Sequence, residues 1–410
     1  MNNTTAAERL EKTYGITSEK GVNPAISDSS TYFFDSAQDM SKTFEGQTEG
    51  MYLYSRHSSP STNYLARSLA AMENMPAALV TASGMSAIAV TLMQLLQSGE
   101  HIVAGRTIYG GSYALLKNFL PRYQIETSFV NMINLEHVSQ AIKHNTKVLY
   151  FESLSNPLLE IPDFNAIRLL AQEKGIKIVV DNTFTPLLCV PKELGADVVI
   201  HSLTKFINGT SDALGGVVCG DTEFVEALRD VNSGASMLLG PTMDAQRAAS
   251  ILKNMRTLSV RMQKHSQNAL YLATKLESDG FTVLYPGLRS HPQHALANTF
   301  FDPKIGYGGL LALDMKTHSN AAKLMEGMQE RGLGYLAVSL GFSKTLFSAS
   351  GSSTSSEIPE NEQQAMGLTS GLIRFSIGLD ENIAKTYVQM KSILDGIAEA
   401  QESSLLLTYD

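Results

Sequence analysis

Two apolar runs near the middle of the chain lead into side chains that can do chemistry. The run Ile178–Val180 ends at Asp181, and the run Val198–Ile200 is followed by a polar stretch that reaches Lys205. Short β-branched runs separated by a helix-sized segment are typical of neighbouring strands in a parallel sheet. Because ligands of such sheets bind beyond the carboxyl ends of the strands, the spacing predicts one site that contains both the carboxylate and the amine.

This combination of groups is what pyridoxal phosphate (PLP) requires of a protein. PLP is held by a lysine through a Schiff base, by a carboxylate against its pyridinium nitrogen and by donors around its phosphate. Lys205 and Asp181 supply the first two groups, and the hydroxyls of Ser202 and Thr204 lead into the lysine. Taken singly, such an aspartate is often a helix cap and such a lysine is usually solvated, so the prediction depends on their occurrence together.

Further candidate ligands lie upstream of this pair. The turn Ser83–Ser86 contains a glycine and opens a predicted helix, where free backbone N–H groups favour a phosphate. Tyr109 stands in a strand-to-helix loop, where an aromatic ring either covers the core or stacks on a flat cofactor. Tyr54 and Arg56 share one side of an extended segment, and Arg suits a phosphate. A surface Arg beside a packed Tyr is the alternative interpretation of that pair.

Two more groups are predicted to lie near the same edge of the sheet. Glu152 and Asn156 follow the strand that ends near Phe151. Arg374 stands inside an otherwise apolar strand close to the C-terminus. A buried Arg needs an anion, and either the α-carboxylate of a substrate or a structural ion pair would supply it.

Composition indicates an ordinary globular enzyme. The chain has 410 residues, 43% of them hydrophobic, and a net charge of -8 without any basic run, which argues against nucleic acid as a partner. Cys189 and Cys219 stand in apolar surroundings and are predicted to be reduced, buried thiols. Residues 1–15 lack an apolar signal core and no segment resembles a membrane span, so a cytoplasmic location is expected. The loop setting of His291–His294 makes a metal site improbable.

The order of the patterns predicts an α/β protein in three parts. Residues 1–62 form a polar N-terminal arm that contacts a neighbouring subunit, residues 63–258 a large cofactor-binding domain with a mostly parallel sheet, and residues 259–410 a smaller C-terminal α/β domain. The polar segment 349–366 is predicted to be a loop. Helical patterns cover Tyr64–Met75, Leu135–Lys143, Asn165–Lys174, Asp244–Leu272, Asn320–Arg331 and Asn382–Ala398.

Eight short motifs, taken together, resemble one family over nearly the whole chain. That family is the Cys/Met-metabolism family of PLP enzymes, which has fold type I, the aspartate-aminotransferase-like fold. The motifs occur in the family's order and spacing: YSRH, SGMSA, YGGS, ESLSNP, VVDNTF, HSLTKF, AVSLG and GLIRFSIGL. The resemblance implies bound PLP, a small sulfur amino acid as substrate, and a homotetramer built from two intimate dimers whose active sites are shared between subunits.

The resemblance also assigns roles to residues at the matching positions. Lys205 would bind the cofactor covalently, Asp181 would pair with its ring nitrogen and Tyr109 would stack on its ring; these are the expected catalytic residues. Gly84, Met85, Ser202 and Thr204 would hold the phosphate, together with Tyr54 and Arg56 of the neighbouring subunit. The substrate carboxylate would be held, or the cofactor oriented, by Asn156, Ser339 and Arg374.

Within this family the chain is most similar to the methionine γ-lyases of the plant type. The segments LLGPTMDA, YPGLRSHPQHAL and IGYGGLLALDM carry that likeness. Gly111 stands where bacterial methionine γ-lyases carry a Cys, and Ser58–Ser61 replaces a GNPT-like run. Both changes lie near the expected substrate entrance, so they concern specificity rather than PLP chemistry. The alternatives are the γ-replacement reactions of cystathionine synthesis or O-acylhomoserine sulfhydrylation, cystathionine γ-lyase activity, or a PLP carrier without turnover.

Overall fold

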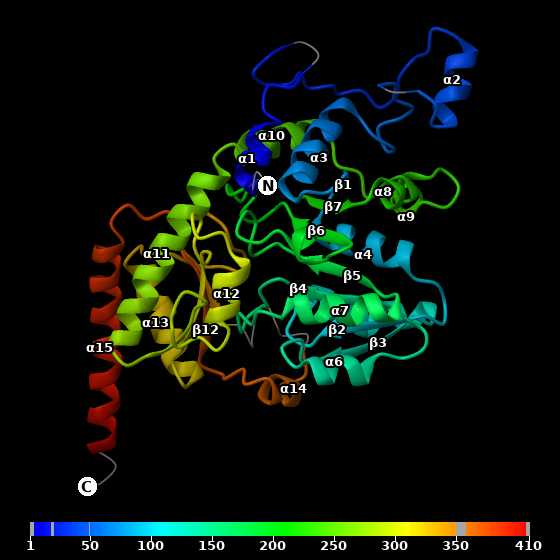
Figure 1. Cartoon of the computed structure of the whole chain (residues 1–410). Coiled ribbons are helices and arrows are strands. Elements are labelled where there is room, and N and C mark those ends of the chain that lie inside the picture. The colour runs from blue at the N-terminus through cyan, green and yellow to red at the C-terminus, as the bar shows by residue number, and fades with distance from the viewer. Residues whose placement is uncertain (1–3, 18–19, 49, 350–357, 407–410) are drawn as a thin grey trace.

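A computed structural model of the chain describes residues 4–17, 20–48, 50–349 and 358–406. Within them the chain builds a seven-stranded sheet and a five-stranded sheet, each with its own helices (Figure 1). Across the larger sheet the strands are β1 (Ala77–Thr81), β7 (Gly216–Gly220), β6 (Val198–Ser202), β5 (Lys177–Asp181), β4 (Thr146–Glu152), β2 (His101–Gly105) and β3 (Glu126–Val130).

The larger sheet is mostly parallel, as the sequence predicted. Strands β6, β5, β4, β2 and β3 pair in parallel, and β7 runs antiparallel to both β6 and β1. The carboxyl ends of β4, β5 and β6 therefore lie at one edge. Because β7 is reversed, its first residue, Gly216, pairs there with Ser202 of β6 and with Thr81 of β1. The carboxyl end of β1, which leads into the Ser83–Ser86 turn, consequently joins the same edge.

Helices cover both faces of this sheet because its strands carry apolar side chains on both sides. One face packs against α3 (Pro60–Met72), α6 (Leu135–Ala141), α7 (Phe164–Lys174) and α10 (Ala245–Met255). The other packs against α4 (Gly84–Leu95), α5 (Gly110–Ala114) and α8 (Thr222–Arg229). Shorter elements complete this part: the π-helix Leu115–Phe119, the 3₁₀ helices Leu120–Tyr123 and Pro191–Leu194, and α9 (Ala235–Leu239).

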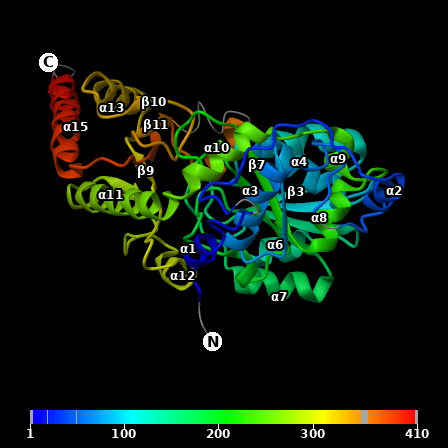
Figure 2. The ribbon, with the colours of Figure 1, turned by 90° about the horizontal axis from the view of Figure 1, so that it is seen from above.

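The C-terminal part forms the smaller sheet with a separate core. Its strands in order are β10 (Tyr335–Leu336), β11 (Leu346–Ala349), β12 (Leu372–Ser376), β9 (Leu310–Asp314) and β8 (Thr282–Leu284). Seen from above, α15, α13 and α11 gather at the end of the molecule away from α2 (Figure 2). The helices here are α11 (Leu258–Ser278), α12 (His294–Phe300), α13 (His318–Glu330), α14 (Glu360–Ala365) and α15 (Ile383–Leu406). Two sheets with distinct cores accord with two domains, whose boundaries stay a prediction.

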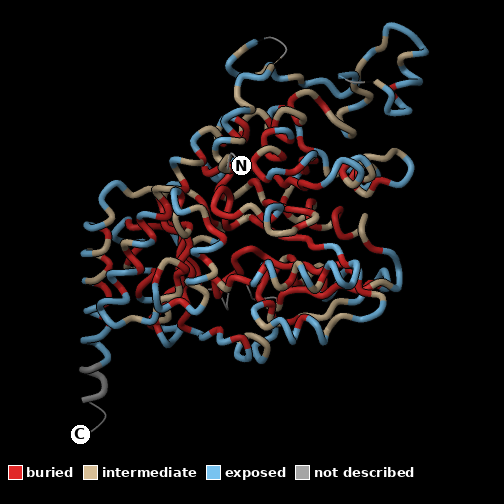
Figure 3. The backbone as a smooth tube through the Cα atoms, viewed as in Figure 1, coloured by how far each residue is buried: buried red, intermediate tan, exposed pale blue. Residues whose placement is uncertain are grey.

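The N-terminal segment divides into a packed part and a projecting part. Helix α1 (Ala6–Glu11) buries Ala6 and Leu10 in the core beside α3 of its own chain. Helix α2 (Ala37–Phe44) stands away from the body of the molecule, and most of the chain around it is exposed (Figure 3). Phe33, for example, exposes 92% of its surface. An exposed aromatic of this size fits a surface that another molecule covers.

Several boundaries differ from the sequence-based expectation for local reasons. Helix α3 starts at Pro60 rather than near Tyr64, because Ser59 caps it and Pro suits the first helical position. The helical pattern over Asp244–Leu272 is two helices, α10 and α11. The segment 349–366, predicted to be a loop, contains α14 and follows strand β11; residues 350–357 lie outside the described part.

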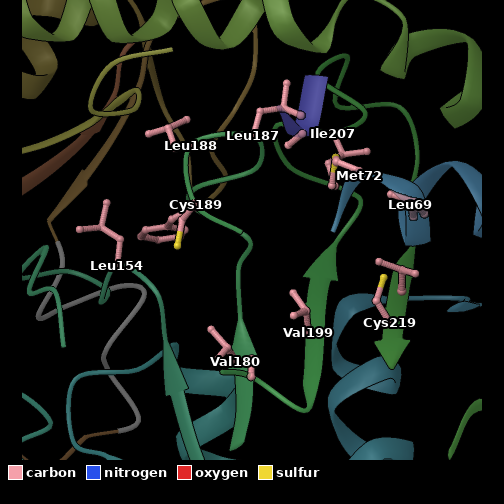
Figure 4. Packing of buried hydrophobic residues seen from close by; sticks show 14 of the residues in the cluster. Leu69, Met72, Leu154, Val180, Leu187, Leu188, Cys189, Val199, Ile207 and Cys219 are labelled. Carbon is pink, nitrogen blue, oxygen red and sulfur yellow. The ribbon is translucent and has the colours of Figure 1, made fainter. Parts of the chain in front are cut away.

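The two cysteines are free and buried, as predicted. Figure 4 shows both among the apolar side chains of the larger core, Cys189 near Leu188 and Cys219 on β7. Burial raises the pKa of both thiols well above the ordinary value, so both stay protonated. Among the described residues, no helix is long and apolar enough to cross a membrane.

A buried polar network fastens α3 to the sheet beneath the carboxyl edge. Glu73, which follows α3, accepts hydrogen bonds through Oε1 from His201 Nε2 at 2.7 Å and from Asn182 Nδ2 at 3.2 Å. Asn182 also donates to the carbonyl of Cys189 at 3.0 Å and accepts from the hydroxyl of Thr185 at 2.6 Å. One carboxylate oxygen thus bonds a side chain that follows β5 and one near the end of β6, whereas Glu73 Oε2 and His201 Nδ1 have no partner among the described residues.

Replacing Glu73 with Ala should therefore destabilise the protein by about 3–5 kcal/mol, because it leaves two buried donors without their acceptor. Glu73→Gln keeps one oxygen acceptor and should cost less. Glu193→Ala is the matched control, since it removes a half-exposed carboxylate that pairs with Arg9 at the surface, and it should cost under about 1 kcal/mol. Urea unfolding followed by circular dichroism measures the free energy of unfolding of each variant. Equal losses in Glu73→Ala and Glu193→Ala would contradict the prediction.

Candidate active site

A cavity of about 200 Å³ lies at the carboxyl edge of the larger sheet, below the smaller one. It collects most of the residues that the sequence placed in a site, although they are far apart in the chain. The predicted residues among its lining are Gly84, Met85, Tyr109, Asn156, Asp181, Ser202, Thr204, Lys205 and Arg374. The structure thus brings together nine residues that come from both sheets.

Lys205 extends into this cavity from the turn after β6. Its amine Nζ donates a hydrogen bond to the hydroxyl of Ser339 at 3.0 Å, which places Ser339 beside the cavity as well. Burial, and then the positive charge of Arg374, lower the pKa of Lys205 from 10.5 to about 8. A substantial fraction of the amine is therefore uncharged near neutral pH, which is the form that acts as a nucleophile.

Asp181 ends β5 and is held by Thr183. Its Oδ1 accepts from the Thr183 hydroxyl at 2.5 Å and from the Thr183 backbone N–H at 3.0 Å. The same hydroxyl accepts from the backbone N–H of Ser202 at 2.8 Å, so Thr183 connects the ends of β5 and β6. Burial raises the pKa of Asp181, and the two Thr183 hydrogen bonds oppose that rise. A cation beside this carboxylate would stabilise its charged form further.

The start of α4 forms a narrow cradle against the end of β6. A Cβ atom on Gly84 would lie 2.7 Å from the Cβ of Ser202, so only glycine allows this approach. Ser83 caps the helix by accepting the backbone N–H of Ser86, which leaves the positive end of the helix facing the cavity. Thr204 stands beside it and accepts from the backbone N–H of Gly215 at 3.2 Å. An anion such as a phosphate fits this cradle.

Arg374 reaches the cavity from β12 of the smaller sheet. Its Nη1 donates to Asn156 Oδ1 at 3.3 Å and its Nη2 to the carbonyl of Ser339 at 3.2 Å, while Nε has no partner among the described residues. Burial lowers the pKa of this guanidinium to about 10. Both acceptors are neutral, and the ion pairs of the described residues do not include Arg374. Of the two interpretations of this Arg, the arrangement favours an external anion.

Tyr109 stands immediately before α5 with 44% of its surface exposed, and its ring lines the cavity. Its backbone N–H donates to Glu152 Oε1 at 2.8 Å. A side chain at position 111 would collide with this ring, since a Cβ added to Gly111 would lie 2.5 Å from Tyr109 Cε1. The ring therefore occupies space that a larger residue at position 111 would contest.

Tyr54 and Arg56 do not line the cavity of their own chain. The Arg56 guanidinium lies 5.9 Å from the centre of the Tyr54 ring, and its Nη1 donates to the carbonyl of Met237 at 3.4 Å. Both residues instead line a hollow with Phe33 and Phe44 of the N-terminal segment. The structure of one chain thus separates these two predicted residues from the other nine.

Sequence reasoning assigned no role to two polar residues of the site. Thr183 was visible as a hydroxyl directly after Asp181, but its double hydrogen bonding depends on the register of β5 and β6. Glu152 was placed at the right edge without a role. Apolar lining residues were missed too, because an apolar side chain beside a cavity has the same sequence pattern as one in the core: they are Ile88, Leu154, Phe184, Leu214, Val338 and Leu340.

The residues present fit PLP on chemical grounds. An amine with a lowered pKa, a buried carboxylate, a helix start closed to any side chain at Gly84, and an aromatic ring face one cavity. The unpartnered Nε of a buried Arg marks a second anion position beside them. These are the separate requirements of a Schiff-base lysine, a ring-nitrogen partner, a phosphate cradle and a carboxylate binder.

Comparisons with known proteins agree with this fit. Residues 4–387 match the family described as Cys/Met metabolism PLP-dependent enzyme. The methionine gamma-lyase of Arabidopsis thaliana is 44% identical over 90% of this chain and 86% of its own, and the cystathionine gamma-lyase of Bacillus subtilis is 35% identical over 87% and 90%. A putative O-acetylhomoserine (thiol)-lyase of Campylobacter jejuni, solved with a pyridoxyl-lysine phosphate, superposes with a TM-score of 0.87 at 31% identity, covering 95% of this chain and 100% of its own.

The fold and site define a PLP-dependent enzyme of fold type I. The chain belongs to the Cys/Met metabolism family of these enzymes, whose members act in sulfur amino acid metabolism.

The lowered pKa of Lys205 predicts how the PLP-free protein takes up its cofactor. Covalent capture needs the uncharged amine, so the rate should rise about tenfold per pH unit below pH 8 and level off above it. The growth of the visible absorbance of bound PLP measures this rate, with Nα-acetyl-lysine in the same buffers as the reference for PLP itself. Arg374→Gln should move the midpoint to higher pH, because it removes a nearby positive charge. A midpoint near 10 in the unaltered protein would refute the effect of burial.

Proposed function

We propose that the protein is a methionine γ-lyase, which converts L-methionine and water to methanethiol, 2-oxobutanoate and ammonia. The observation that carries this choice is the mixed lining of the cavity. Arg374 and Lys205 both hydrogen-bond to Ser339, so their charges lie close together, and the lining also includes the apolar side chains of Leu154, Leu214 and Val338. Methionine matches this mixed lining, since it has one charged end and an uncharged thioether. Cystathionine carries a second charged amino-acid group and O-succinylhomoserine a second carboxylate, which an apolar wall disfavours.

Binding and orientation of the substrate fall to charged and polar residues of the site. The Arg374 guanidinium, held by Asn156 and Ser339, binds the α-carboxylate of methionine. The Asp181 carboxylate, held by Thr183, would pair with the protonated ring nitrogen of the cofactor. Bound PLP supplies an electron sink, which stabilises negative charge on the carbon atoms next to the substrate nitrogen.

Proton transfer falls to Lys205 and Tyr109. The Lys205 amine, whose pKa is lowered to about 8, takes one proton from Cα and one from Cβ; one of these ends on Cγ, and the other replaces the proton that Tyr109 gives to the sulfur. The Tyr109 hydroxyl donates a proton to the sulfur, so that methanethiol leaves as the neutral thiol as the bond between Cγ and sulfur breaks. Water then releases 2-oxobutanoate and ammonia, which balances the atoms of methionine.

A second candidate is a γ-replacement or a lysis of cystathionine with the same residues. It is favoured by two relatives whose sequence identity to this chain is similar to that of the bacterial methionine gamma-lyases: one is named cystathionine gamma-lyase and the other O-succinylhomoserine sulfhydrylase. The reactions differ in whether a thiol enters before the four-carbon product is released, and that step depends on access to the cavity rather than on the polar groups.

Product analysis of the purified, PLP-loaded protein separates these functions. L-methionine, L-cystathionine, and O-acetylhomoserine with sulfide are supplied in separate reactions. We expect methanethiol and 2-oxobutanoate from methionine at a rate above that of the other two. Lys205→Ala should lose all turnover and the visible absorbance of bound PLP. Homocysteine formation without methionine breakdown would reject the lyase and identify a sulfhydrylase.

We also propose that the active sites are shared between subunits of a homotetramer. Tyr54 and Arg56 are partly or fully exposed, lie outside the cavity of their own chain, and belong to a segment with exposed aromatic residues. In a two-fold symmetric dimer, such a segment reaches the partner's site exactly as the partner's reaches the first. The Arg56 guanidinium would then face the phosphate of the partner's PLP.

Subunit complementation tests this sharing. Arg56→Ala and Lys205→Ala, each of low activity alone, are co-expressed with different tags and purified as hybrids. One site of each hybrid dimer then carries neither change, so random pairing should restore roughly a quarter of the original activity. Co-expression of Asp181→Ala with Lys205→Ala is the matched control and should restore nothing, because both residues belong to their own chain's cavity. Absence of rescue in the first pair would refute shared sites.

A further inference from the structure

Glu152 holds two separate loops of the active site with one carboxylate. Its Oε1 accepts from the backbone N–H of Tyr109 at 2.8 Å, and its Oε2 accepts from the backbone N–H of Asn156 at 2.9 Å. Tyr109 lies in the segment that joins β2 to α5, whereas Asn156 lies after β4, the strand that Glu152 itself ends. The two oxygens of Glu152 therefore each bind the backbone of a different segment, and both segments face the same cavity.

Both residues that Glu152 holds are connected to groups with proposed roles in the reaction. The Asn156 side chain accepts from Arg374 at 3.3 Å, so the connection runs from the larger sheet to β12 of the smaller one. The Tyr109 ring also lines this cavity. A shift of Glu152 would consequently change the separation between the aromatic ring and the guanidinium.

Burying the Glu152 carboxyl group next to Asp181 costs free energy, which a residue that only filled space would not require. Glu152 and Asp181 are register partners on β4 and β5, and both line the same cavity. Burial, and then the charge of Asp181, raise the pKa of Glu152 well above its ordinary value, while the N–H groups of Tyr109 and Asn156 and the charge of Arg374 oppose this. An uncharged glutamine would avoid the repulsion, but it has one acceptor oxygen, whereas the two N–H groups bond to different oxygens of Glu152.

The geometry points to Glu152 as a positioning residue for substrate binding and proton transfer. It fixes the Tyr109 ring and, through Asn156, the Arg374 guanidinium, so that the ring and the carboxylate-binding group keep one separation. The inference rests on the proposed roles of Tyr109 and Arg374 in the reaction.

Glu160 provides a matched control in the same two loops. Its Oε2 accepts from the Thr107 hydroxyl at 2.7 Å, two residues before Tyr109, and its backbone N–H donates to Ser155. It does not line the cavity. Glu152→Gln and Glu160→Gln thus each weaken a carboxylate connection between these loops, but only the first removes an acceptor from the backbone of site residues.

Amide hydrogen exchange of the PLP-free protein is the direct test. In Glu152→Gln the new amide group has one acceptor oxygen for two N–H donors. The exchange rate of the backbone amide of Tyr109, of Asn156 or of both should rise at least about tenfold, because that factor corresponds to the loss of one hydrogen bond. Glu160→Gln should leave both amides as in the unaltered protein. Unchanged exchange in Glu152→Gln would overturn the inference.

Binding by the PLP-loaded protein gives a readout that a purely structural role would not move. Spectral titration with L-norleucine, which has the length of methionine but no sulfur to eliminate, reports only on loaded molecules. Glu152→Gln should weaken this binding about 10- to 100-fold, with KM for L-methionine rising in parallel. The effect should shrink in an Asn156→Ala background, because both changes act on Arg374. Equal weakening by Glu160→Gln, or full additivity with Asn156→Ala, would overturn the inference.

The outcomes also separate this inference from the proposed function. If the unaltered protein does not degrade methionine, the γ-lyase proposal fails, yet exchange and norleucine binding still decide the role of Glu152. Glu152→Asp keeps the charge but is one methylene shorter, so it should protect at most one of the two amides. If Glu152→Gln and Glu152→Asp both fail to fold while Glu160→Gln folds, Glu152 is a folding residue and the positioning role is rejected.

Discussion

The parallel register of β4, β5 and β6 is the constraint on which the site depends. It places Glu152 and Asp181 as direct neighbours, and it brings the end of β6, with Ser202, to the same edge. The reversed strand β7 then adds β1 and the start of α4 to that edge. A slip by one residue in any of these strands would turn its polar end residue to the opposite face. The continuous apolar packing on both faces of the sheet opposes such a slip, so the core and the site are specified together.

The balance of charge in the cavity follows from burial. Two basic groups, Lys205 and Arg374, and two carboxyl groups, Asp181 and Glu152, line one cavity and are largely buried. Burial moves the pKa of each group toward its neutral form, and nearby hydrogen bonds and charges decide how far. For Lys205 the result is an amine ready to react, whereas Arg374 keeps its charge because its pKa of about 10 is still far above neutral pH. The same environment therefore gives the two cations different uses.

Much of this arrangement was predictable from the sequence because it depends on local patterns. β-branched runs that end in Asp181 and lead to Lys205 indicate both the strands and the edge where they meet. Arg374 stood out in the sequence as a charge in an apolar strand, and the family resemblance assigned it to the substrate carboxylate. What no pattern showed was that its hydrogen-bond acceptors are neutral, since Asn156 and Ser339 come from distant parts of the chain. Short elements such as β10 and α14 were missed because their stability comes from contacts with other segments rather than from their own sequence.

Tyr54 and Arg56 illustrate a limit of another kind. Their motif assigns them to a phosphate, but the folded chain keeps them outside its own cavity beside exposed aromatic residues. Within one chain this segment lacks the burial that would fix an Arg over an anion, whereas the cradle at Gly84 is closed by Ser202 of the same chain. A site assembled in this way would have a rigid half, built by the sheet, and a half whose geometry depends on association. Cofactor affinity would then depend on the concentration of the assembled protein as well as on its fold.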